Sequence, residues 1–331
     1  MQNSVLFGPS GKDITFTPKS GGGDDGYIAW LAGFGLTAYE ISFGRGVRLS
    51  PKTAEILSAS AKKHGIAISA HAPYFVNLAS GDKKIVENSY NYIKQSLEIL
   101  RILCDGGGVG VGSFSVARAQ SFNEQKSNGL HGFGGITSSA VENKPTPTPP
   151  TPAPMRLVVH TGAQCKLSRE RAVKNCEKNL AWVVERLKTD GFENFLLCIE
   201  TMGRYSQIGN ADEIIRLCSV AKNIIPCIDF GHINCIEQGA IQRDPNRMCE
   251  ILDAVRMAGI DTIHIHFSAI VYTAKGEHTH TTLDDTRWNF DFAPLAKYLK
   301  THELNARVIC ESKNKMAQDA IKLVDIYNNL C

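Results

Sequence analysis

Short apolar runs alternate with longer amphipathic segments along most of the chain. The short runs are rich in Val and Ile, which favours buried strands. The strand candidates are Ser4–Phe7, Ala38–Ser42, Ala67–Ala70, Arg156–His160, Phe195–Ile199, Ile225–Asp229, Asp261–His266 and Arg307–Glu311. Segments with the periodicity of helices lie between them and include Pro51–His64, Lys83–Leu103, Ser168–Lys188 and Ala211–Ala221.

Eight strands that alternate with helices predict a parallel sheet built from βαβ units. Such units have right-handed crossovers, and eight of them close naturally into a barrel. The alternative is an open doubly wound sheet, but no G-x-G-x-x-G motif follows any strand candidate, and the segment 8–12 is too short for a P-loop. Two helix starts carry their own signals, because Pro51 suits a first helical position and Ser168 offers a capping hydroxyl. The sequence therefore predicts one α/β domain over residues 1–331, a (β/α)8 TIM barrel.

A Gly/Pro-rich segment interrupts this pattern at residues 105–154. Glycines crowd its first part, and six of the chain's 13 prolines fall between Lys144 and Pro154. This composition offers few apolar side chains to offset the entropy that is lost on ordering. We expect a flexible, low-complexity surface insertion between the third helix of the barrel and its fourth strand. The proline tract is either a solvated loop or a binding site for a protein partner that recognises PxxP segments.

Composition limits the partners and the compartment. The 36 basic and 33 acidic side chains give a net charge of +3, which excludes a histone-like nucleic-acid binder but allows a local basic groove. The longest apolar-leaning stretch, Ile28–Ile41, is too short to span a bilayer and contains Glu40. The N-terminus has no signal-peptide pattern, and no two of the ten cysteines are spaced C-x-x-C. We expect a monomeric intracellular protein, cytoplasmic or, in a eukaryote, nuclear, with reduced cysteines and no membrane partner.

Ionisable residues at the strand ends carry the main chemical signal. In a parallel barrel the active site lies at the carboxyl ends of the strands. Each strand from the third to the eighth brings a His, Asp or Glu to this rim, and the loops after the sixth and seventh strands add more. The resulting set is His71, His160, Glu200, Asp229, His232, His266, Glu277, His278, His280 and Glu311.

This set predicts a metal centre. A lone histidine after a strand is more often a hydrogen-bonded structural residue, but clustered buried carboxylates repel one another and need a cation beside them. Imidazole and carboxylate donors without cysteine suit zinc, with manganese and iron as competitors. One ion needs about three or four protein ligands, and the rim offers at least eight, so we expect two or three ions. Centres of that kind suit phosphoester hydrolysis.

The rim residues stand in short motifs. In chain order these are H-A-P-Y, V-V-H-x-G, I-E-T-x-G, I-D-x-x-H, H-x-H-F-S and a final I-C-E. Together they resemble the endonuclease IV family, which comprises zinc-dependent apurinic/apyrimidinic endonucleases with a xylose-isomerase-like barrel. The resemblance covers nearly all of the chain outside 105–154, and it extends to Phe7-Gly-Pro and to the segment Phe43–Arg48.

The resemblance implies three zinc sites that share one carboxylate. Glu200 would be the catalytic residue and would bridge the first zinc to the second. Many family members have an aspartate two residues before the position of His280, where this chain has His278, so the third site departs from the family pattern. The implied ligands are His71 and His160 with Glu200, then Glu200 with Asp229, His266 and Glu311, and finally His232 and His280 with His278 or Glu277.

The same resemblance implies a substrate and a reaction. The substrate would be double-stranded DNA that carries abasic sites, with Arg45 and Tyr74 in contact with it. The reaction would be hydrolysis of the phosphodiester 5′ to the abasic site, as in base excision repair, and it would leave a 3′-hydroxyl. His264 alternates with His266 and therefore also faces the barrel interior, where we expect it to fill a layer or support a ligand.

Two other functions fit parts of the pattern. A sugar or sugar-phosphate isomerase or epimerase on the same barrel would need one divalent ion and only Glu200, Asp229, His266 and Glu311, without the four additional histidines. A non-catalytic DNA-binding or scaffold protein would use the Pro-rich insertion, but every ligand position here holds a residue that can bind metal. Basic residues at the rim either contact DNA phosphates or stay solvated; they are Arg45, Arg48, Lys52, Arg204 and Lys275.

Overall fold

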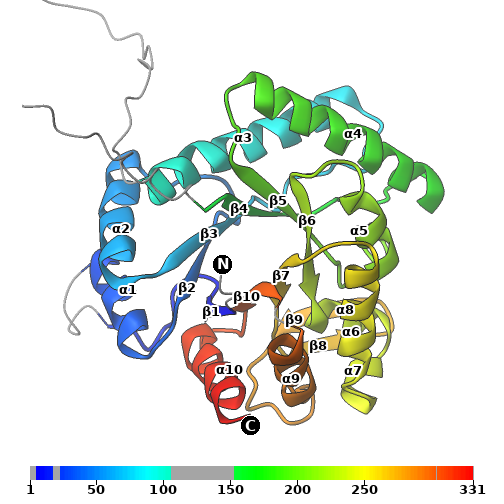
Figure 1. Ribbon diagram of the computed structural model, residues 1–331. Helices are drawn as coiled ribbons and strands as arrows, with labels where there is room; N and C mark the ends of the chain where they lie inside the picture. Colours follow the sequence, from blue (N-terminus) through cyan, green and yellow to red (C-terminus); the bar gives the residue numbers. More distant parts are fainter. Residues whose placement is uncertain (1–4, 18–22, 106–152, 303, 331) are drawn as a thin grey trace, which may run out of the picture. The chain divides into compact units, whose positions relative to one another are not determined.

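Eight parallel strands form one continuous sheet that curls into a barrel (Figure 1). The computed structural model describes residues 5–17, 23–105, 153–302 and 304–330. Along the sheet the strands follow the order β1-β10-β7-β6-β5-β4-β3-β2. Their bounds are β1 Leu6–Pro9, β2 Ala38–Ser42, β3 Ala67–His71, β4 Met155–Val159, β5 Phe195–Glu200, β6 Ile224–Asp229, β7 Thr262–His266 and β10 Asn305–Cys310.

The first and last strands of this order, β1 and β2, close the barrel. The Thr37 amide donates to the Phe7 carbonyl at 2.9 Å, and the Gly11 amide donates to the Glu40 carbonyl at 2.9 Å. The two backbones approach so closely that a Cβ atom on Gly8 would lie 1.8 Å from the Ala38 carbonyl oxygen. Glycine is therefore required at position 8, and the predicted (β/α)8 TIM barrel is confirmed.

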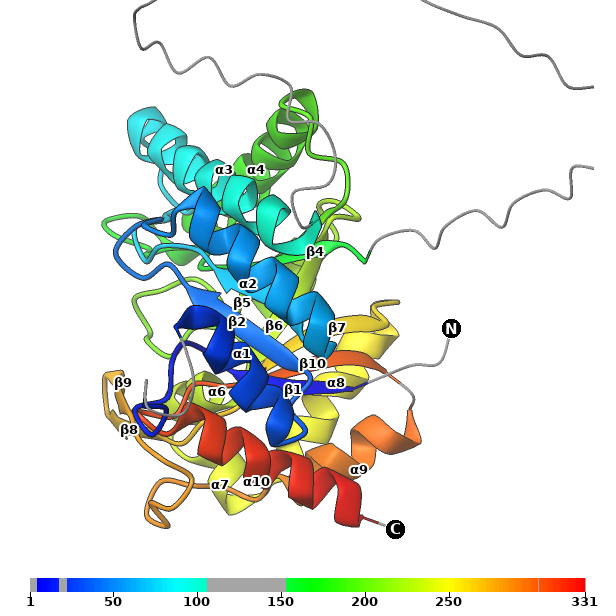
Figure 2. The same cartoon turned by 90° about the vertical axis from the view of Figure 1, so that its left-hand side faces the viewer.

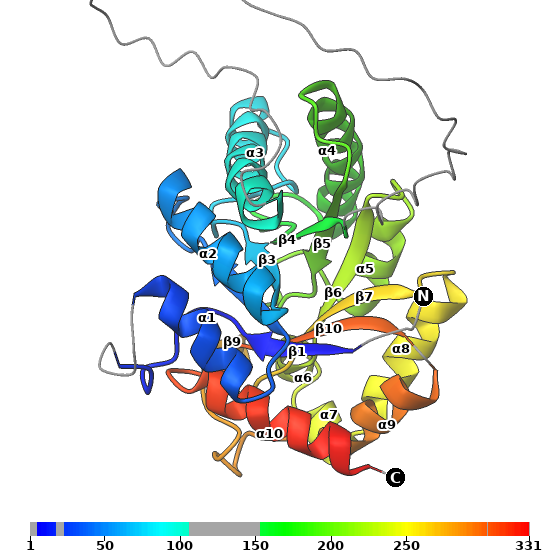
Figure 3. The same cartoon turned by 60° about the vertical axis from the view of Figure 1, so that its left-hand side comes forward.

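Helices pack around the outside of the barrel (Figures 1 and 3). The Ser50 hydroxyl accepts from the Thr53 amide at 3.1 Å with Pro51 in the first turn, and Ser168 accepts from the Arg171 amide at 3.3 Å, so both expected helix starts are confirmed. The helices are α1 Asp24–Gly33, α2 Pro51–His64, α3 Lys83–Asp105, α4 Arg169–Thr189, α5 Ala211–Cys218, α6 Phe230–Ile236, α7 Ala240–Arg243, α8 Arg247–Met257, α9 Ala293–Thr301 and α10 Met316–Asn329. None of the helices in the described ranges is long and apolar enough to cross a membrane.

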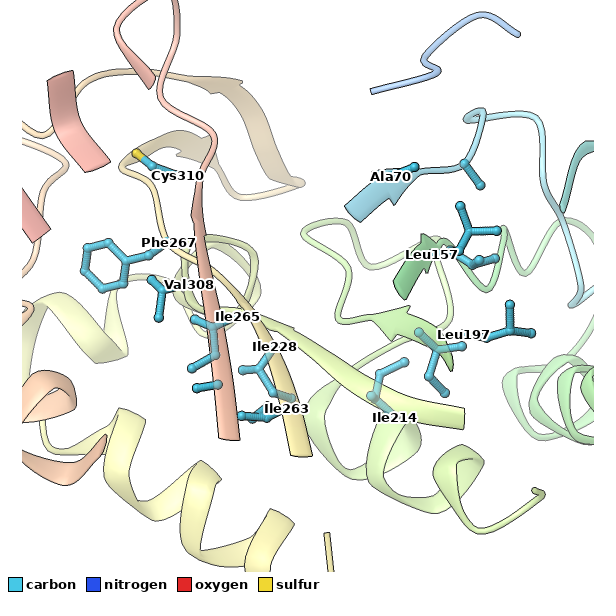
Figure 4. Close-up of a cluster of buried hydrophobic side chains, with 14 of the residues drawn as sticks. Ala70, Leu157, Leu197, Ile214, Ile228, Ile263, Ile265, Phe267, Val308 and Cys310 are labelled. Atoms are coloured by element: carbon cyan, nitrogen blue, oxygen red, sulfur yellow. The ribbon is translucent and has the colours of Figure 1, made fainter. Parts of the chain in front are cut away.

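The main apolar core lies between the strands and the helices. Alternate residues of each strand face outward, and Figure 4 shows Ile263 and Ile265 of β7 beside Val308 of β10 and Ile228 of β6. The other set of alternate residues faces the barrel interior, which is largely polar. It contains the fully buried Glu40, Ser69 and His264 and the nearly buried Arg156 and Arg307. At the carboxyl ends of the strands, the last residues of this inward-facing set form the rim.

Two strands outside the barrel form an antiparallel hairpin that the sequence patterns do not predict. Strand β8 spans Ile270–Thr273 and β9 spans Gly276–His280. The hairpin contacts α6 at one end of the barrel (Figure 2). The predicted insertion at 105–154 falls outside the described residues except at its two edges.

Candidate metal centre

Rim side chains from six consecutive strands converge at the carboxyl end of the barrel. A cavity of about 360 Å³ opens there and is lined by Tyr74 and Arg204 as well as by predicted ligands. The ligand atoms fall into groups in which every pair lies within 4.8 Å. Three groups are at the rim: His71, His160 and Glu200; Glu200, Asp229, His266 and Glu311; and His232, Glu277 and His280.

The first group centres on one oxygen of Glu200. Oε2 of this carboxylate lies 2.7 Å from His160 Nε2 and 3.1 Å from His71 Nε2. His71 Nδ1 faces the Ala72 carbonyl at 2.8 Å and donates to it, so the ring presents Nε2 to the group. Burial lowers the pKa of His71, but the hydrogen bond with Glu200 and the negative charges of Glu200, Glu311 and Glu40 together outweigh it and raise this pKa to about 9. Two imidazoles and a carboxylate thus share one point, as they do around a metal ion.

The second group places three carboxylates around one imidazole. His266 Nδ1 lies 2.9 Å from Glu200 Oε1, 3.4 Å from Glu311 Oε2 and 3.9 Å from Asp229 Oδ2. Burial and the nearby Glu200 raise the pKa of the Asp229 carboxyl above its ordinary value, although His232 opposes this shift. Such crowding of buried acids is costly unless a cation lies between them.

One carboxylate oxygen of this second group, Oδ2 of Asp229, is not satisfied by a hydrogen bond. Asp229 Oδ1 accepts from the His232 amide at 2.7 Å, whereas the buried Oδ2 has no hydrogen-bond partner. His232 Nδ1 lies 3.2 Å from Oδ2, but its proton is directed at the Thr201 carbonyl, 2.9 Å away. A buried carboxylate oxygen that faces other acids and has no hydrogen-bond partner is suited to bind a cation. The residues present therefore fit a divalent ion.

The third group joins the first turn of α6 to strand β9. Because Nδ1 of His232 is held by a backbone carbonyl, its Nε2 faces Glu277 Oε2 at 3.7 Å. His280 Nδ1 lies 3.0 Å from the Ser268 hydroxyl, and its Nε2 lies 4.0 Å from Glu277 Oε1. Both rings therefore direct Nε2 toward the same carboxylate.

A β-bulge at His278 explains why Glu277 belongs to this group. In the hairpin register Val271 pairs with Thr279 and Tyr272 pairs with Glu277, so His278 is an extra residue without a partner. The extra residue shifts the alternation and brings Glu277 onto the same face as His280. His278, which the sequence offered as a ligand, is exposed and lies outside every group found in the described chain.

Close contact between two glycines fixes the hairpin against the loop after β5. The Glu277 amide donates to the Gly203 carbonyl at 2.7 Å. A Cβ atom on Gly276 would lie 2.2 Å from that carbonyl oxygen, and one on Gly203 would lie 2.7 Å from the His232 ring. Larger residues at either position would push Glu277 away from His232.

The predicted DNA-contacting residues lie in adjacent loops at the rim. The Tyr74 amide donates to the Gly44 carbonyl at 3.1 Å, which places the loop of Tyr74 beside the exposed Arg45. The Tyr74 ring is 62 % exposed, and its centroid lies 5.5 Å from that of His160. Arg48, Lys52, Arg204 and Lys275 are also exposed.

Sequence reasoning missed Glu40, an inward-facing residue of β2. Its carboxylate is fully buried and lies 3.0 Å from Nε2 of His266 and 3.0 Å from Nε2 of His264. His264 belongs with Cys227 and His266 to a fourth, fully buried group inside the barrel. A glutamate within an otherwise apolar strand is the signal that could have drawn attention to this position.

Comparisons with known proteins bear on the family and the fold. A family model described as "Xylose isomerase-like TIM barrel" matches residues 28–106 and 154–327. An uncharacterized protein of Methanocaldococcus jannaschii is 28 % identical over 332 residues, with 98 % of each chain covered.

Solved structures of two kinds of enzyme share the fold. Endonuclease IV from Thermus thermophilus superposes with a TM-score of 0.57 at 18 % identity, over 98 % of this chain and 97 % of that one. A D-tagatose 3-epimerase-like protein superposes with a TM-score of 0.61 at 18 % identity, over 98 % and 96 % of the two chains. Both sequence identities are low, so these matches show the barrel fold alone, and the reaction has to be inferred from the residues of the site.

Proposed function

This chain belongs to the xylose isomerase-like TIM barrel family, and we propose that within it the protein is a metal-dependent phosphodiesterase that incises DNA on the 5′ side of abasic sites. The observation that carries this proposal is the presence of three ligand groups at one rim, each of which contributes side chains to the lining of the same cavity. A one-metal isomerase needs the second group alone. The first and third groups add His71, His160, His232, Glu277 and His280, for which that reaction has no use.

The donor set suits zinc at the rim. The three groups there contain imidazole and carboxylate donors and no thiol, and each offers three or four ligands. Manganese or iron would fit the carboxylate-rich second group as well. When bound, divalent ions supply Lewis-acid charge that activates water and stabilises the departing oxygen of a phosphodiester.

Glu200 couples the first two groups. Its Oε2 faces His71 and His160, whereas its Oε1 faces His266. One carboxylate therefore sets the distance between the two sites, and a phosphate that spans them would be aligned by it. We assign to Glu200 the role of bridging ligand, without which the remaining residues would hold their ions independently.

The rim beside the cavity provides features suited to damaged DNA. Arg45 and Arg204 are exposed and would contact phosphates, which orients a duplex without reading its sequence. Tyr74 and Phe75 are 62 % and 57 % exposed, an unusual state for two adjacent aromatic rings. An abasic position lacks a base to stack on its neighbours, so these rings would fill the gap and direct the sugar toward the cavity.

A sugar epimerase is the second candidate. The group of Glu200, Asp229, His266 and Glu311 is sufficient for one ion, and a cavity of about 360 Å³ would admit a monosaccharide. This function makes no use of the other two groups. It would therefore predict one tightly bound ion rather than two or three.

The deciding experiment measures strand cleavage and metal content on the same preparation. A duplex with one abasic site is compared with an intact duplex, with Glu200→Gln as the inactive control. Incision that leaves a 3′-hydroxyl and is abolished by chelation supports the proposal. If the abasic duplex stays intact and protein that holds one ion converts D-tagatose, the nuclease proposal is wrong and the epimerase function is supported.

A further inference from the structure

Both ring nitrogens of His266 face buried carboxylates. Nδ1 points to the acids of the second rim group, and Nε2 lies 3.0 Å from Oε1 of Glu40 on the opposite side of the ring. His266 and Glu40 are completely buried, so no water competes for these contacts. A carboxylate can only accept, so in the metal-free protein both ring nitrogens carry a proton. An ion bound at Nδ1 would displace the proton there, whereas Nε2 would keep the proton that it donates to Glu40.

Glu40 divides its two oxygens between different partners. Oε1 accepts a hydrogen bond from His266, and Oε2 accepts one from the Ser69 hydroxyl at 3.0 Å. His264 Nε2 also lies 3.0 Å from Oε2. Neither ring nitrogen of His264 has a hydrogen-bond partner, so its contact with Oε2 is a close approach without hydrogen-bond alignment. The aligned hydrogen bonds on Glu40 therefore come from His266 and Ser69.

Strand geometry holds this arrangement in place. Glu40 pairs with Ser69 in the register of β2 and β3, and His266 lies on β7 across the barrel interior. The contact between Glu40 and His266 thus joins two strands that are three positions apart around the barrel, directly beneath the rim. Neither side chain can turn away without leaving a charge unpaired in the interior.

We propose that Glu40 is a positioning residue for the metal centre, which holds His266 as the Nε2–H tautomer so that Nδ1 presents its lone pair to the ion bound with Glu200, Asp229 and Glu311. A ligating histidine whose other nitrogen donates to a carboxylate has a fixed ring orientation and is a stronger base. This inference deepens the proposed function, because it rests on the same metal centre, but it holds for any reaction performed there.

The test is the affinity of the full-length protein for Zn²⁺, measured by competition with a chelator. In Glu40→Gln the ring loses its charged acceptor, and we expect the zinc held by Glu200, Asp229, His266 and Glu311 to bind roughly 10- to 100-fold more weakly. Glu40→Asp keeps the charge and should recover part of the loss. Glu185→Gln, which makes the same chemical change at an exposed position on α4, is the matched control and should leave zinc affinity near that of the wild type. Thermal unfolding of the metal-free proteins separates weaker binding from weaker folding.

A second measurement needs no variant and covers the case in which Glu40→Gln does not fold. Imidazole nitrogen NMR of the zinc-loaded wild type should show His266 protonated at Nε2 and metal-bound through Nδ1. The opposite tautomer, or unchanged zinc affinity in a folded Glu40→Gln protein, would overturn the proposal. A thiolate-to-metal charge-transfer band in the Co²⁺-loaded protein would also overturn it. That band would mean that an ion is bound inside the barrel by Cys227 and His264, the group to which His266 also belongs. Absence of DNA incision with the expected loss of zinc affinity would instead reject only the proposed substrate.

Discussion

Replacement of Glu200 by glutamine tests the centre at its shared carboxylate. The amide is close in size, so the barrel should still fold, but it is a poor ligand and cannot bridge two cations. We expect the variant to lose most of its hydrolysis of abasic DNA and to bind fewer zinc ions. The more specific expectation concerns the metal-free protein, in which Glu200 accepts from His71 and His160.

The magnitude follows from the pKa of His71. The difference between its value of about 9 and the ordinary 6.5 corresponds to about 3 kcal/mol. A histidine whose pKa is higher in the folded chain than in the unfolded chain stabilises the fold at pH values below its unfolded pKa. That contribution is lost as the pH rises through the folded pKa. Metal-free wild type should therefore lose about 3 kcal/mol of stability from this group between about pH 6 and pH 10.

Glu200→Gln should remove this part of the pH dependence. Without this carboxylate, burial acts on His71 against only the weaker influence of Glu311 and Glu40, so its pKa falls. Urea unfolding of chelator-treated proteins at about pH 6 and pH 10 gives the comparison, with Glu185→Gln on the exposed face of α4 as the control. The stability gap between wild type and Glu200→Gln should be about 3 kcal/mol larger at the lower pH. Parallel pH profiles for the two proteins would refute the assignment of the His71 pKa to Glu200.

Three further changes probe other parts of the molecule. Glu277→Ala should lower the zinc content by about one ion per chain, whereas His278→Ala should leave it unchanged. Metal analysis of both variants tests whether Glu277, rather than His278, is the ligand. Gly8→Ala should destabilise the fold by roughly 3 kcal/mol or more in urea unfolding, because the added Cβ meets the Ala38 carbonyl at the closing seam; a near-neutral effect would contradict that account. Tyr74→Ala should weaken binding of abasic duplex by about 1–3 kcal/mol in a fluorescence titration, with little effect on intact duplex, and an equal loss on both would reject the stacking role.

The sequence predicted those features that local patterns determine. Strand β2 and helix α2 begin and end where expected, because a short apolar run marks the strand and Pro51 marks the first turn of the helix. In the structure Ser50 caps that first turn and Gly65 ends the helix in the left-handed conformation. The rim residues could also be placed, because parallel strands of a barrel all end on one side. The contribution of Glu277 could not be predicted, since it depends on a bulge that forms only when the hairpin pairs. Glu40 was missed because its partners lie on strands that are distant in the sequence.

The interior of the barrel shows why metal binding and folding should be linked in this protein. Barrels of this kind usually fill their interior with branched aliphatic side chains, whereas this one buries Arg156 and Arg307, whose guanidinium groups donate to the carbonyls of Ile263 and Ile68 at 3.0 Å each. Burial lowers the pKa of Arg307 to about 10, a sign of the cost of such an interior. Beneath the rim the buried Glu40 contacts His266 at 3.0 Å, and above this contact the carboxylates of Glu200 and Glu311 crowd around the same ring. Cations at the rim would relieve the repulsion between these carboxylates, so metal binding should stabilise the fold.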